Sequence, residues 1–330
     1  MKKIVLYGVG SYLKSYLADF ENVLDNVLMI VDGSNEKVGK KFHGFEIKSK
    51  EELRDISDEV IIAIASETYY ECIKGDIKEI NSKLKCLTLT DALLKIYTPI
   101  GYCNLCKTSV GFWRRIGEKN KTVYTIIGNG QRRGGCPVCG SYDRNRWQYY
   151  VIKNYTELLN QKSVVLHFAP EYPLLSKIKE NIGTKYYTAD IQEGRADYVV
   201  DITNIKFEEK KFDYIIANHV LEHITNERKA ISELIRCLKD NGIIILSFPV
   251  TMETKTLENC NHISEEDRIK YYGQKDHVRL YGNDYIDRLE RYGLNVEALI
   301  PNELLDKQTI IMNGFIENDI MLLCTKRQTI

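Results

Sequence analysis

The sequence predicts an α/β protein with two Rossmann-like, doubly wound parallel sheets joined by a small zinc-ribbon-like module. Two observations lead to this prediction. Short apolar runs alternate with segments of helical periodicity, once in residues 1–97 and again in residues 148–330. Between them, residues 98–147 contain two Cys-x-x-Cys pairs, a pattern typical of a small module held together by a metal. These three ranges are the expected domains.

The bulk composition excludes several classes of protein. The chain has 330 residues, more than one hydrophobic core usually organises. Its 46 basic and 46 acidic residues balance, which disfavours nucleic acid as a partner. No apolar run reaches the ~20 residues of a membrane span, and the start MKKIVLYGVG predicts a strand and a turn. We therefore expect a cytoplasmic protein with reduced cysteines. The sequence does not decide between a single chain and a homo-oligomer.

The first range predicts strands at KKIVLYG, VLMIVD and EVIIAIAS with helical segments between them. Gly8 and Gly10 would let the backbone approach a phosphate, and Asp32 ends the second strand where an acid can hold ribose hydroxyls. Leu13 replaces the third glycine of the dinucleotide fingerprint, so a scaffold domain with a tight turn is the alternative. The range resembles the N-terminal nucleotide-binding-like domains fused to bacterial sugar-modifying enzymes. That resemblance implies a nucleotide or nucleotide-sugar ligand.

The middle range carries the candidate metal ligands. Each Cys-x-x-Cys pair can present two thiolates to one tetrahedral zinc ion. A module of about 50 residues needs such a structural metal to be stable. The 29 residues between the pairs are expected to form a hairpin from VYTII and GNGQRRGG. Reduced structural cysteines and a redox pair are the alternatives. The predicted zinc ligands are Cys103, Cys106, Cys136 and Cys139.

Four arginines crowd the second Cys-x-x-Cys pair. They suggest a patch for an anionic ligand or nucleic acid, and the alternative is ordinary solvated charge. These arginines are Arg132, Arg133, Arg144 and Arg146.

The third range predicts a seven-stranded doubly wound domain. The run VVLHF is a buried strand that stops at Ala169, and a helix follows from Leu174. Free N–H groups at such a helix start can bind a nucleotide-like ligand. Further strands are expected at KYYTAD, DYVVDIT, FDYIIAN, GIIILSFPV, LNVEALI and DIMLLCTK. The helix ERKAISELIRCLKDNG is expected to stop at Gly242.

Residues 150–326 resemble the class I S-adenosylmethionine-dependent methyltransferases. The ordered segments LHFAPE, TAD, VVDIT, HVLEH and GQKDHVRLYG carry this resemblance. Together they resemble a methyltransferase type 11-like subgroup in which a Cys-x-x-Cys module precedes the catalytic domain. The chain departs from the usual Asp/Glu-x-Gly-x-Gly motif, because HFAPE stands there.

The resemblance implies a set of residues around S-adenosylmethionine. Asp190 would bind the ribose hydroxyls, Asp201 and Ile202 the adenine, and Glu171 the ammonium group. Asn218 and His219 would lie beneath the methionine part. Loop caps or packing are the alternatives for these side chains. The full expected set is His167, Ala169, Glu171, Asp190, Asp201, Ile202, Asn218 and His219.

The candidate catalytic residues are His277, His223 and Arg279. An imidazole can accept the proton of a hydroxyl group, and a guanidinium can hold a phosphate or carboxylate in a bidentate manner. Asp276 can orient His277. The alternatives are packing for His223 and, for His277 with Arg279, a network that ties the insertion to the sheet.

His219 and His223 are four residues apart, so a helical turn would place them on one face beside Glu222. No Glu directly follows the first histidine, so the metalloprotease pattern fails and metal is disfavoured there.

The function implied is methyl transfer from S-adenosylmethionine, most simply to a hydroxyl oxygen of a small molecule or of a sugar or glycan precursor. One alternative is an RNA methyltransferase that grips RNA with the zinc module. Another is a non-catalytic scaffold that binds the cofactor or a nucleotide. A nicotinamide oxidoreductase would need a hydride-transfer site, and the sequence offers no candidate for it.

Overall fold

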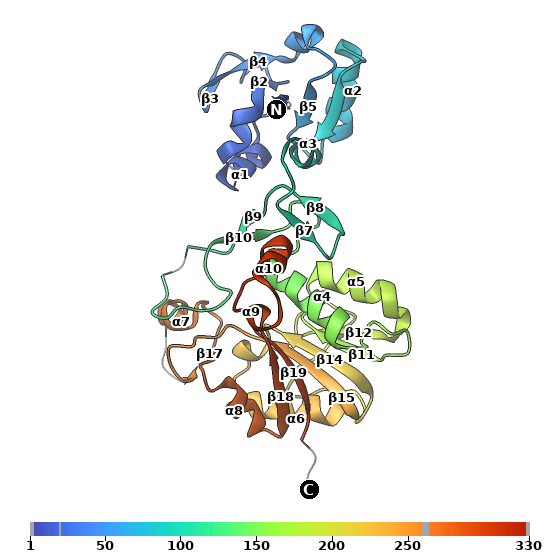
Figure 1. The fold of residues 1–330 in the computed structure, drawn as a ribbon, viewed down its shortest axis with the longest axis vertical. Helices are drawn as coiled ribbons and strands as arrows, with labels where there is room; N and C mark the ends of the chain where they lie inside the picture. The colour runs from blue at the N-terminus through green and yellow to red at the C-terminus, as the bar shows by residue number, and fades with distance from the viewer. Residues whose placement is uncertain (1–2, 20, 120, 259–263, 328–330) are drawn as a thin grey trace. The chain divides into compact units, whose positions relative to one another are not determined.

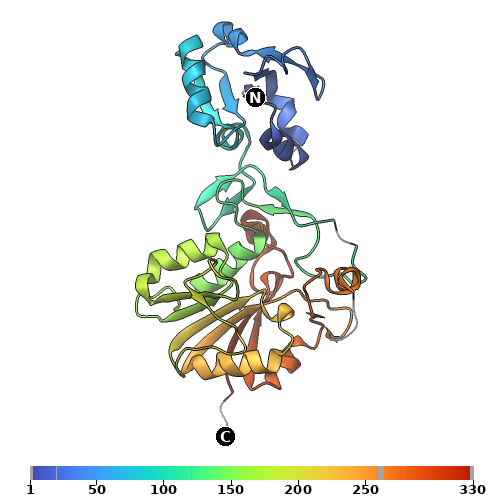
Figure 2. The ribbon, with the colours of Figure 1, turned by 180° about the vertical axis from the view of Figure 1, so that it is seen from behind.

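The computed structural model describes residues 3–19, 21–119, 121–258 and 264–327. The chain folds as two compact units (Figures 1 and 2). The first consists of Met1–Tyr102 with Thr108–Arg114, and the second of Cys103–Lys107 with Arg115–Ile330. Within the described residues, no helix is both long enough and apolar enough to cross a membrane.

The first unit is built on a six-stranded sheet of order β3-β4-β2-β1-β5-β6, in which only the β3–β4 pair is antiparallel. The central strand β1 is buried at every position. Its elements are β1 (Ile4–Tyr7), α1 (Ser11–Asp19), η1 (Glu21–Asn26), β2 (Val27–Asp32), β3 (Lys41–Phe42), β4 (Phe45–Ser49), η2 (Lys50–Asp55), β5 (Ile61–Ile64), α2 (Tyr70–Ile80), β6 (Lys85–Thr88) and α3 (Leu89–Ile96).

Two short hairpin-like pairs connect the sheets. β7 (Gly101–Cys103) pairs with β8 (Thr108–Val110), and β9 (Arg114–Ile116) pairs with β10 (Arg132–Gly135). The expected strand at VYTII is wrong. Only Ile127 of that run makes a β-bridge, and its partner is Val250 rather than β10. The segment is held by the C-terminal domain, so its partner lies beyond the reach of a local hairpin pattern.

The second unit contains the predicted seven-stranded sheet, with strand order β13-β12-β11-β14-β15-β19-β18. The first five strands run parallel, and β19 runs antiparallel to both β15 and β18. The sheet therefore confirms the expected class I methyltransferase fold. Its strands are β11 (Val165–Phe168), β12 (Tyr186–Asp190), β13 (Tyr198–Val199), β14 (Phe212–Asn218), β15 (Leu238–Ser247), β18 (Leu294–Leu299) and β19 (Met321–Lys326).

Helices cover both faces of this sheet, with α4 and α5 on one side and α6 and α8 on the other (Figure 1). A core cluster that includes Phe212, Ile231 and Leu322 lies between sheet and helices. The remaining elements are α4 (Asp143–Tyr155), α5 (Tyr172–Ile182), η3 (Gly183–Lys185), η4 (Leu221–His223), α6 (Glu227–Cys237), β16 (Leu257–Glu258), α7 (Glu265–Tyr272), β17 (Arg279–Leu280), α8 (Tyr285–Glu290), α9 (Pro301–Leu304) and α10 (Lys307–Asn313).

The expectation that α6 continues to Gly242 is wrong. The helix ends at Cys237, and the next residue, Leu238, is extended with a ψ of 142° and already begins β15. The β14–β15 register shifts between Phe212 and Tyr214. A Cβ on Gly242 would lie 2.9 Å from the carbonyl oxygen of Asp213, so the glycine allows two strands to approach and does not cap a helix.

Candidate functional site

The four predicted cysteine ligands come together in one cluster. The Sγ atoms of Cys103 and Cys139 are 3.7 Å apart, and those of Cys106 and Cys136 are 3.8 Å apart. A tetrahedral zinc ion with Zn–S bonds of about 2.3 Å places its sulfur ligands about 3.8 Å from each other. The cluster therefore fits a zinc ion.

Arg146 joins this cluster to the end of the chain. Its guanidinium is fully buried, and burial lowers its pKa. The side chain donates four hydrogen bonds to backbone carbonyl oxygens, of Gly134 and Ser141 near the cysteines and of Asn313 and Gly314 at the end of α10. Arg146 is thus neither solvated nor available to nucleic acid.

Two more of the four arginines are paired within the fold. Arg132 donates to both carboxylate oxygens of Asp143, at 2.6 and 2.9 Å. Arg144 binds the carboxylate of Glu171, the residue that precedes α5. The arginine-rich segment therefore differs from both sequence interpretations, because three of its side chains organise the second unit.

The loop after β11 keeps the bend of a glycine motif without its glycine. Ala169 has a φ of +45°, in the left-handed region that favours glycine. Two residues earlier, His167 is buried, and its Nδ1 lies 2.6 Å from the hydroxyl oxygen of Tyr186. Burial lowers the pKa of His167 to about 4, so its imidazole is neutral near pH 7. The side chain of His167 therefore packs within the sheet, and only its backbone lies in the loop.

Glu171 is expected to meet the cofactor's ammonium group, and the structure gives its carboxylate two partners in the chain. Arg144 Nε donates to Oε1 at 3.1 Å, and Asn145 Nδ2 donates to Oε2. Burial raises the pKa of Glu171, but the charge of Arg144 outweighs it and holds the pKa below its ordinary value. Any ammonium group must therefore share this carboxylate with a guanidinium.

Asp190 lies where the resemblance requires an acid, at the carboxyl end of β12. It is mostly buried, and its Oδ1 accepts a hydrogen bond of 2.8 Å from the backbone N–H of Gln192. The next residue, Ile191, is 67% exposed. An apolar side chain left uncovered beside a buried carboxylate offers a surface to a flat ligand ring.

Asp201 and Ile202 are not arranged as a pair of residues that would bind the adenine together. Asp201 is exposed, and its Oδ1 accepts hydrogen bonds of 2.8 Å from both the backbone N–H and the hydroxyl of Thr203. Ile202 is buried in the core. This geometry favours the alternative for Asp201, a carboxylate that caps its own turn.

Asn218 ends β14 and carries an unsatisfied donor. Its Oδ1 accepts a hydrogen bond of 3.2 Å from the hydroxyl of Ser247. Its buried Nδ2 has no acceptor among the described residues, and such an orphan donor indicates a place for a ligand oxygen. His219 follows with a φ of +53°, and its Nδ1 lies 3.3 Å from Oε1 of Glu222.

The prediction that a helical turn places His219 and His223 on one face is wrong. The backbone leaves β14 in a left-handed turn at His219 and then forms only the short 3₁₀ helix η4. The structure instead brings His277 to Glu222 and His223. One candidate ligand atom from each of these three residues lies within 4.8 Å of the other two. We call these three residues the histidine–glutamate cluster.

Glu222 and His277 are buried in this cluster, whereas the side chain of His223 is 33% exposed. Burial lowers the pKa of His277. Burial also raises the pKa of Glu222, but His219 and the two cluster histidines offset it, so this pKa lies below its ordinary value. The cluster therefore combines a buried carboxylate with one buried and one partly exposed imidazole.

Arg279 is not available to hold a substrate anion. Its side chain is fully buried, and its guanidinium donates to the carbonyl oxygens of Leu221, Ile224 and Thr225 and to the carboxylate of Glu258. This geometry favours the alternative, in which Arg279 ties the insertion after β15 to η4 and so fixes the position of Glu222 and His223.

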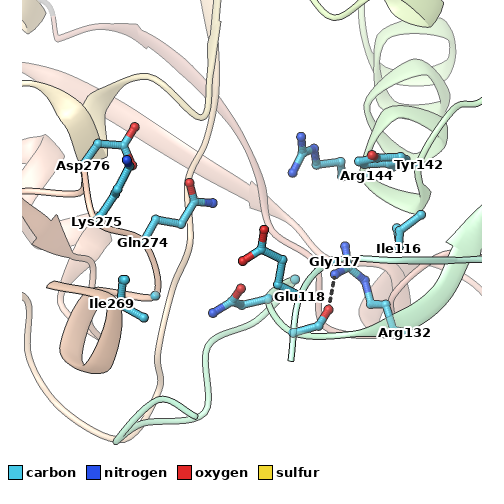
Figure 3. Close-up of a pocket in the computed structure, with 14 residues that line it drawn as sticks. Ile116, Gly117, Glu118, Arg132, Tyr142, Arg144, Ile269, Gln274, Lys275 and Asp276 are labelled. Carbon is cyan, nitrogen blue, oxygen red and sulfur yellow. Dashed lines mark hydrogen bonds between the residues drawn. The ribbon is translucent and has the colours of Figure 1, made fainter. Parts of the chain in front are cut away.

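A cleft of about 640 Å³ opens beside these residues. Figure 3 shows Gln274, Lys275 and Asp276 on one side of the cleft and Tyr142 and Arg144 on the other. Asp276 is the ion-pair partner of His223, at 3.2 Å, and Arg144 is the partner of Glu171. The cleft thus lies between a residue that contacts the histidine–glutamate cluster and one that contacts the loop after β11.

Two functional candidates escape sequence reasoning: Ile191 and Asp319. Asp319 stands just before β19, and because β19 is antiparallel, its start lies at the carboxyl edge of the parallel strands. Burial and the nearby charge of Asp143 raise the pKa of Asp319 to about 6. The position of an acid before the last strand is the only sequence signal that could have drawn attention to it.

In the first unit, Asp32 stabilises its own turn. Its Oδ2 accepts from the backbone N–H of Val9 at 2.9 Å and pairs with Lys37 at 3.1 Å, while its Oδ1 accepts from the N–H of Ser34. Gly8 has a φ of +98°, as a tight turn requires. These contacts favour the scaffold alternative over ribose binding.

Comparison with known protein families gives two matches. Residues 142–299 match a family described as a methyltransferase domain, and residues 1–87 match a family described as C2185-like, N-terminal. No curated protein matches the chain. The first match lies within the second unit.

Several solved structures are similar to part of the chain. The [4+2]-cyclase SpnF is 12% identical, with a TM-score of 0.41 over 56% of this chain and 82% of that one. A putative S-adenosylmethionine-dependent methyltransferase from Listeria monocytogenes is 16% identical, with a TM-score of 0.37 over 55% and 98% of the two chains. The 1,6-didemethyltoxoflavin-N1-methyltransferase from Burkholderia thailandensis is 12% identical, with a TM-score of 0.36 over 51% and 72%.

Proposed function

We propose that the chain is an S-adenosylmethionine-dependent methyltransferase that acts on a hydroxyl oxygen of a small molecule or of a sugar or glycan precursor. The observation that carries the proposal is the match of residues 142–299 to a methyltransferase domain, on a sheet with β19 inserted antiparallel beside β15. In such folds the ligand lies outside the carboxyl ends of the strands. That edge holds the buried Asp190 and the orphan donor of Asn218.

The residues at this edge fit the cofactor. Asp190 would hold the ribose hydroxyls, and Ile191 would cover the adenine in place of the buried Ile202. The backbone from His167 to Ala169, with Asn218 and His219, would surround the methionine part. When bound, S-adenosylmethionine supplies an electrophilic methyl group on a sulfonium sulfur. The chain itself would orient the acceptor in the cleft between Arg144 and Asp276.

The proton of the acceptor hydroxyl needs a base. We propose that the histidine–glutamate cluster provides it. His223 is the partly exposed member of the cluster. His277 is buried, its Nδ1 lies 2.9 Å from the carbonyl oxygen of Tyr272, and it can pass the proton on to Glu222. Arg279 is then a positioning residue that fixes η4.

Calorimetry with S-adenosylmethionine tests the cofactor site. Wild-type protein should bind the cofactor, and Asp190→Asn should weaken binding at least tenfold, because an amide accepts fewer ribose hydrogen bonds than a carboxylate. Asp201→Asn is the matched control and should change the affinity less than threefold, since Asp201 caps its own turn. Equal effects of the two substitutions on the affinity would contradict the proposal that Asp190 binds the cofactor.

We also propose that Cys103, Cys106, Cys136 and Cys139 hold a structural zinc ion. The sulfur spacing supports the proposal. Wild-type protein purified without added metal should carry at least one zinc ion per chain by mass spectrometry, and Cys139→Ser should carry one fewer. Cys72→Ser is the matched control, because Cys72 is an exposed cysteine outside the cluster. An unchanged zinc content in Cys139→Ser would contradict the site.

A non-catalytic scaffold that binds the cofactor is the second candidate. The pairing of Glu171 with Arg144 and Asn145 favours it, because the acid in the loop after β11 already has two partners from α4. Cofactor binding without formation of S-adenosylhomocysteine in the presence of cell extract would support this candidate. An RNA methyltransferase is less well supported, since Arg132, Arg144 and Arg146 are used inside the fold.

We propose three domains, residues 1–97, 98–147 and 148–330. Nucleotide or nucleotide-sugar binding by the first domain remains a proposal that the occupied oxygens of Asp32 weaken. If a nucleotide added at millimolar concentration leaves the amide resonances of Gly8 and Val9 unchanged, this binding proposal is wrong.

A further inference from the structure

We propose that the histidine–glutamate cluster is a second metal site, which binds one divalent first-row transition ion such as Zn²⁺ through Glu222, His223 and His277. The inference goes beyond methyl transfer and is independent of cofactor binding. It is an alternative to the base role proposed above for the cluster, because an imidazole nitrogen that binds a metal cannot also accept a proton. It starts from the three candidate ligand atoms, which lie within 4.8 Å of one another. Two imidazole nitrogens and one carboxylate oxygen form the ligand set of many zinc and non-haem iron sites that keep an open position.

The first argument is the carboxylate of Glu222. Its side chain is only 1% exposed, and neither carboxylate oxygen accepts a hydrogen bond from the described residues. A buried carboxylate without hydrogen-bond donors is costly, and a cation is what compensates it. The nearest cationic candidate in the chain is His219, whose Nδ1 lies 3.3 Å from Oε1 and whose side chain is 26% exposed.

The second argument is the state of the two imidazoles. Nδ1 of His277 lies 2.9 Å from the carbonyl oxygen of Tyr272, which can only accept, so Nδ1 carries the proton and Nε2 has a free lone pair. Nδ1 of His223 lies 3.2 Å from Oδ2 of Asp276 in the same manner. Metal-binding histidines usually donate their second N–H to a carbonyl or a carboxylate. Each cluster histidine has such a partner.

The third argument is the way the three residues are held. Glu222 and His223 belong to η4, and the backbone N–H of Val278 donates to the carbonyl oxygen of Glu222 at 2.8 Å. Arg279 donates to the carbonyl oxygens of Leu221, in η4, and of Ile224, which follows η4. Ligand atoms around a zinc ion lie about 3.4 Å apart for bonds of about 2.1 Å, so small side-chain movements would close the site. The partial exposure of His223 leaves a way in for the ion.

The test uses full-length protein, first stripped of metal and then given Zn²⁺ or Co²⁺ alone, without cofactor. We expect two ions per chain by mass spectrometry. One cobalt ion should show the strong near-ultraviolet absorption of thiolate ligation from the cysteine cluster, and the second should show only the weak visible bands of nitrogen and oxygen ligands. Glu222→Gln and His277→Gln should each lose the second ion, with at least a tenfold weaker affinity, and should keep the first.

His43→Gln is the matched control, because His43 is exposed and lies in the first unit. Thermal unfolding gives a second readout. Added Zn²⁺ should raise the unfolding temperature of the wild type further than that of Glu222→Gln.

One ion per chain in wild type, or a second ion that survives both substitutions, would overturn the proposal. In that case His219, whose Nδ1 lies 3.3 Å from Oε1, is the partner of Glu222. Calorimetry with S-adenosylmethionine on the same variants keeps the two proposals apart. Normal cofactor binding without a second ion contradicts only the metal site, and a second ion without cofactor binding contradicts only the methyltransferase.

Discussion

At the scale of single residues, His167 makes folding stability depend on pH. Its pKa falls from 6.5 to about 4 because the imidazole is buried. Between these values the unfolded chain binds a proton that the folded chain does not, so the free energy of unfolding decreases as the pH falls. The decrease is about 1.4 kcal/mol per pH unit and reaches at most about 3 kcal/mol at pH 4.

Urea denaturation of wild type and His167→Gln between pH 7.5 and pH 4.5 measures this dependence. The difference in unfolding free energy between the two proteins should stay constant above pH 7. Between pH 7 and pH 5 the wild type should lose about 2 kcal/mol of unfolding free energy relative to His167→Gln. His43→Gln, at an exposed histidine, is the matched control. Parallel pH profiles for wild type and His167→Gln would contradict the assignment.

Ala169 stores backbone strain at the bend after β11. A left-handed φ of +45° costs an alanine about 1–2 kcal/mol, and glycine avoids that cost but loses about 0.5–1 kcal/mol through its freer unfolded chain. We expect Ala169→Gly to raise the free energy of unfolding by up to about 1 kcal/mol. Ala92→Gly inside α3 should have the opposite sign, and destabilisation by both in urea would count against the strain.

At the scale of elements, Arg146 connects the cysteine cluster to α10. One guanidinium serves four carbonyl oxygens, and the shorter single ammonium of a lysine cannot reach them all. Arg146→Lys should therefore lower the free energy of unfolding by about 3 kcal/mol or more, because buried carbonyls lose their donors. It should also speed proteolysis of the loop between β9 and β10. Arg133→Lys, at an exposed neighbour, should stay within about 0.5 kcal/mol.

Most strands of the seven-stranded sheet were predictable because they are local apolar runs, although the apolar run VYTII forms no strand. In the first unit VLMIVD corresponds residue for residue to β2, and in the second LNVEALI and DIMLLCTK contain β18 and β19. Gly242 misled the prediction, since a helix stop and a close strand contact both select glycine. The pattern of a single segment does not tell these two needs apart.

The site was predictable where its residues end strands and unpredictable where tertiary contacts make it. Asp190 and Asn218 follow from strand ends. His277 meets Glu222 only because the insertion after β15 folds back onto η4, and its position in the sequence carries no sign of that contact. The arginine partner of Glu171 was missed for the same reason, since α4 and α5 pack together only in the folded sheet.

At the scale of the whole molecule, each sheet has its own hydrophobic core. The clusters around Leu6 and Ile62 belong to the first unit, and the cluster around Ile215 belongs to the second. Such a chain is expected to unfold in more than one step, because separate cores lose their packing separately. A ligand that binds one unit then stabilises only the corresponding transition.

S-adenosylhomocysteine in scanning calorimetry tests this expectation. At about 100 times its dissociation constant the ligand adds about 2.7 kcal/mol, which corresponds to roughly 5–11 °C for a domain of this size. We expect that shift in one transition, with the other unmoved, and we expect Asp190→Asn to abolish it while both transitions remain. A single transition, or two that move together, would show that the cores unfold as one and that ligand binding stabilises both sheets.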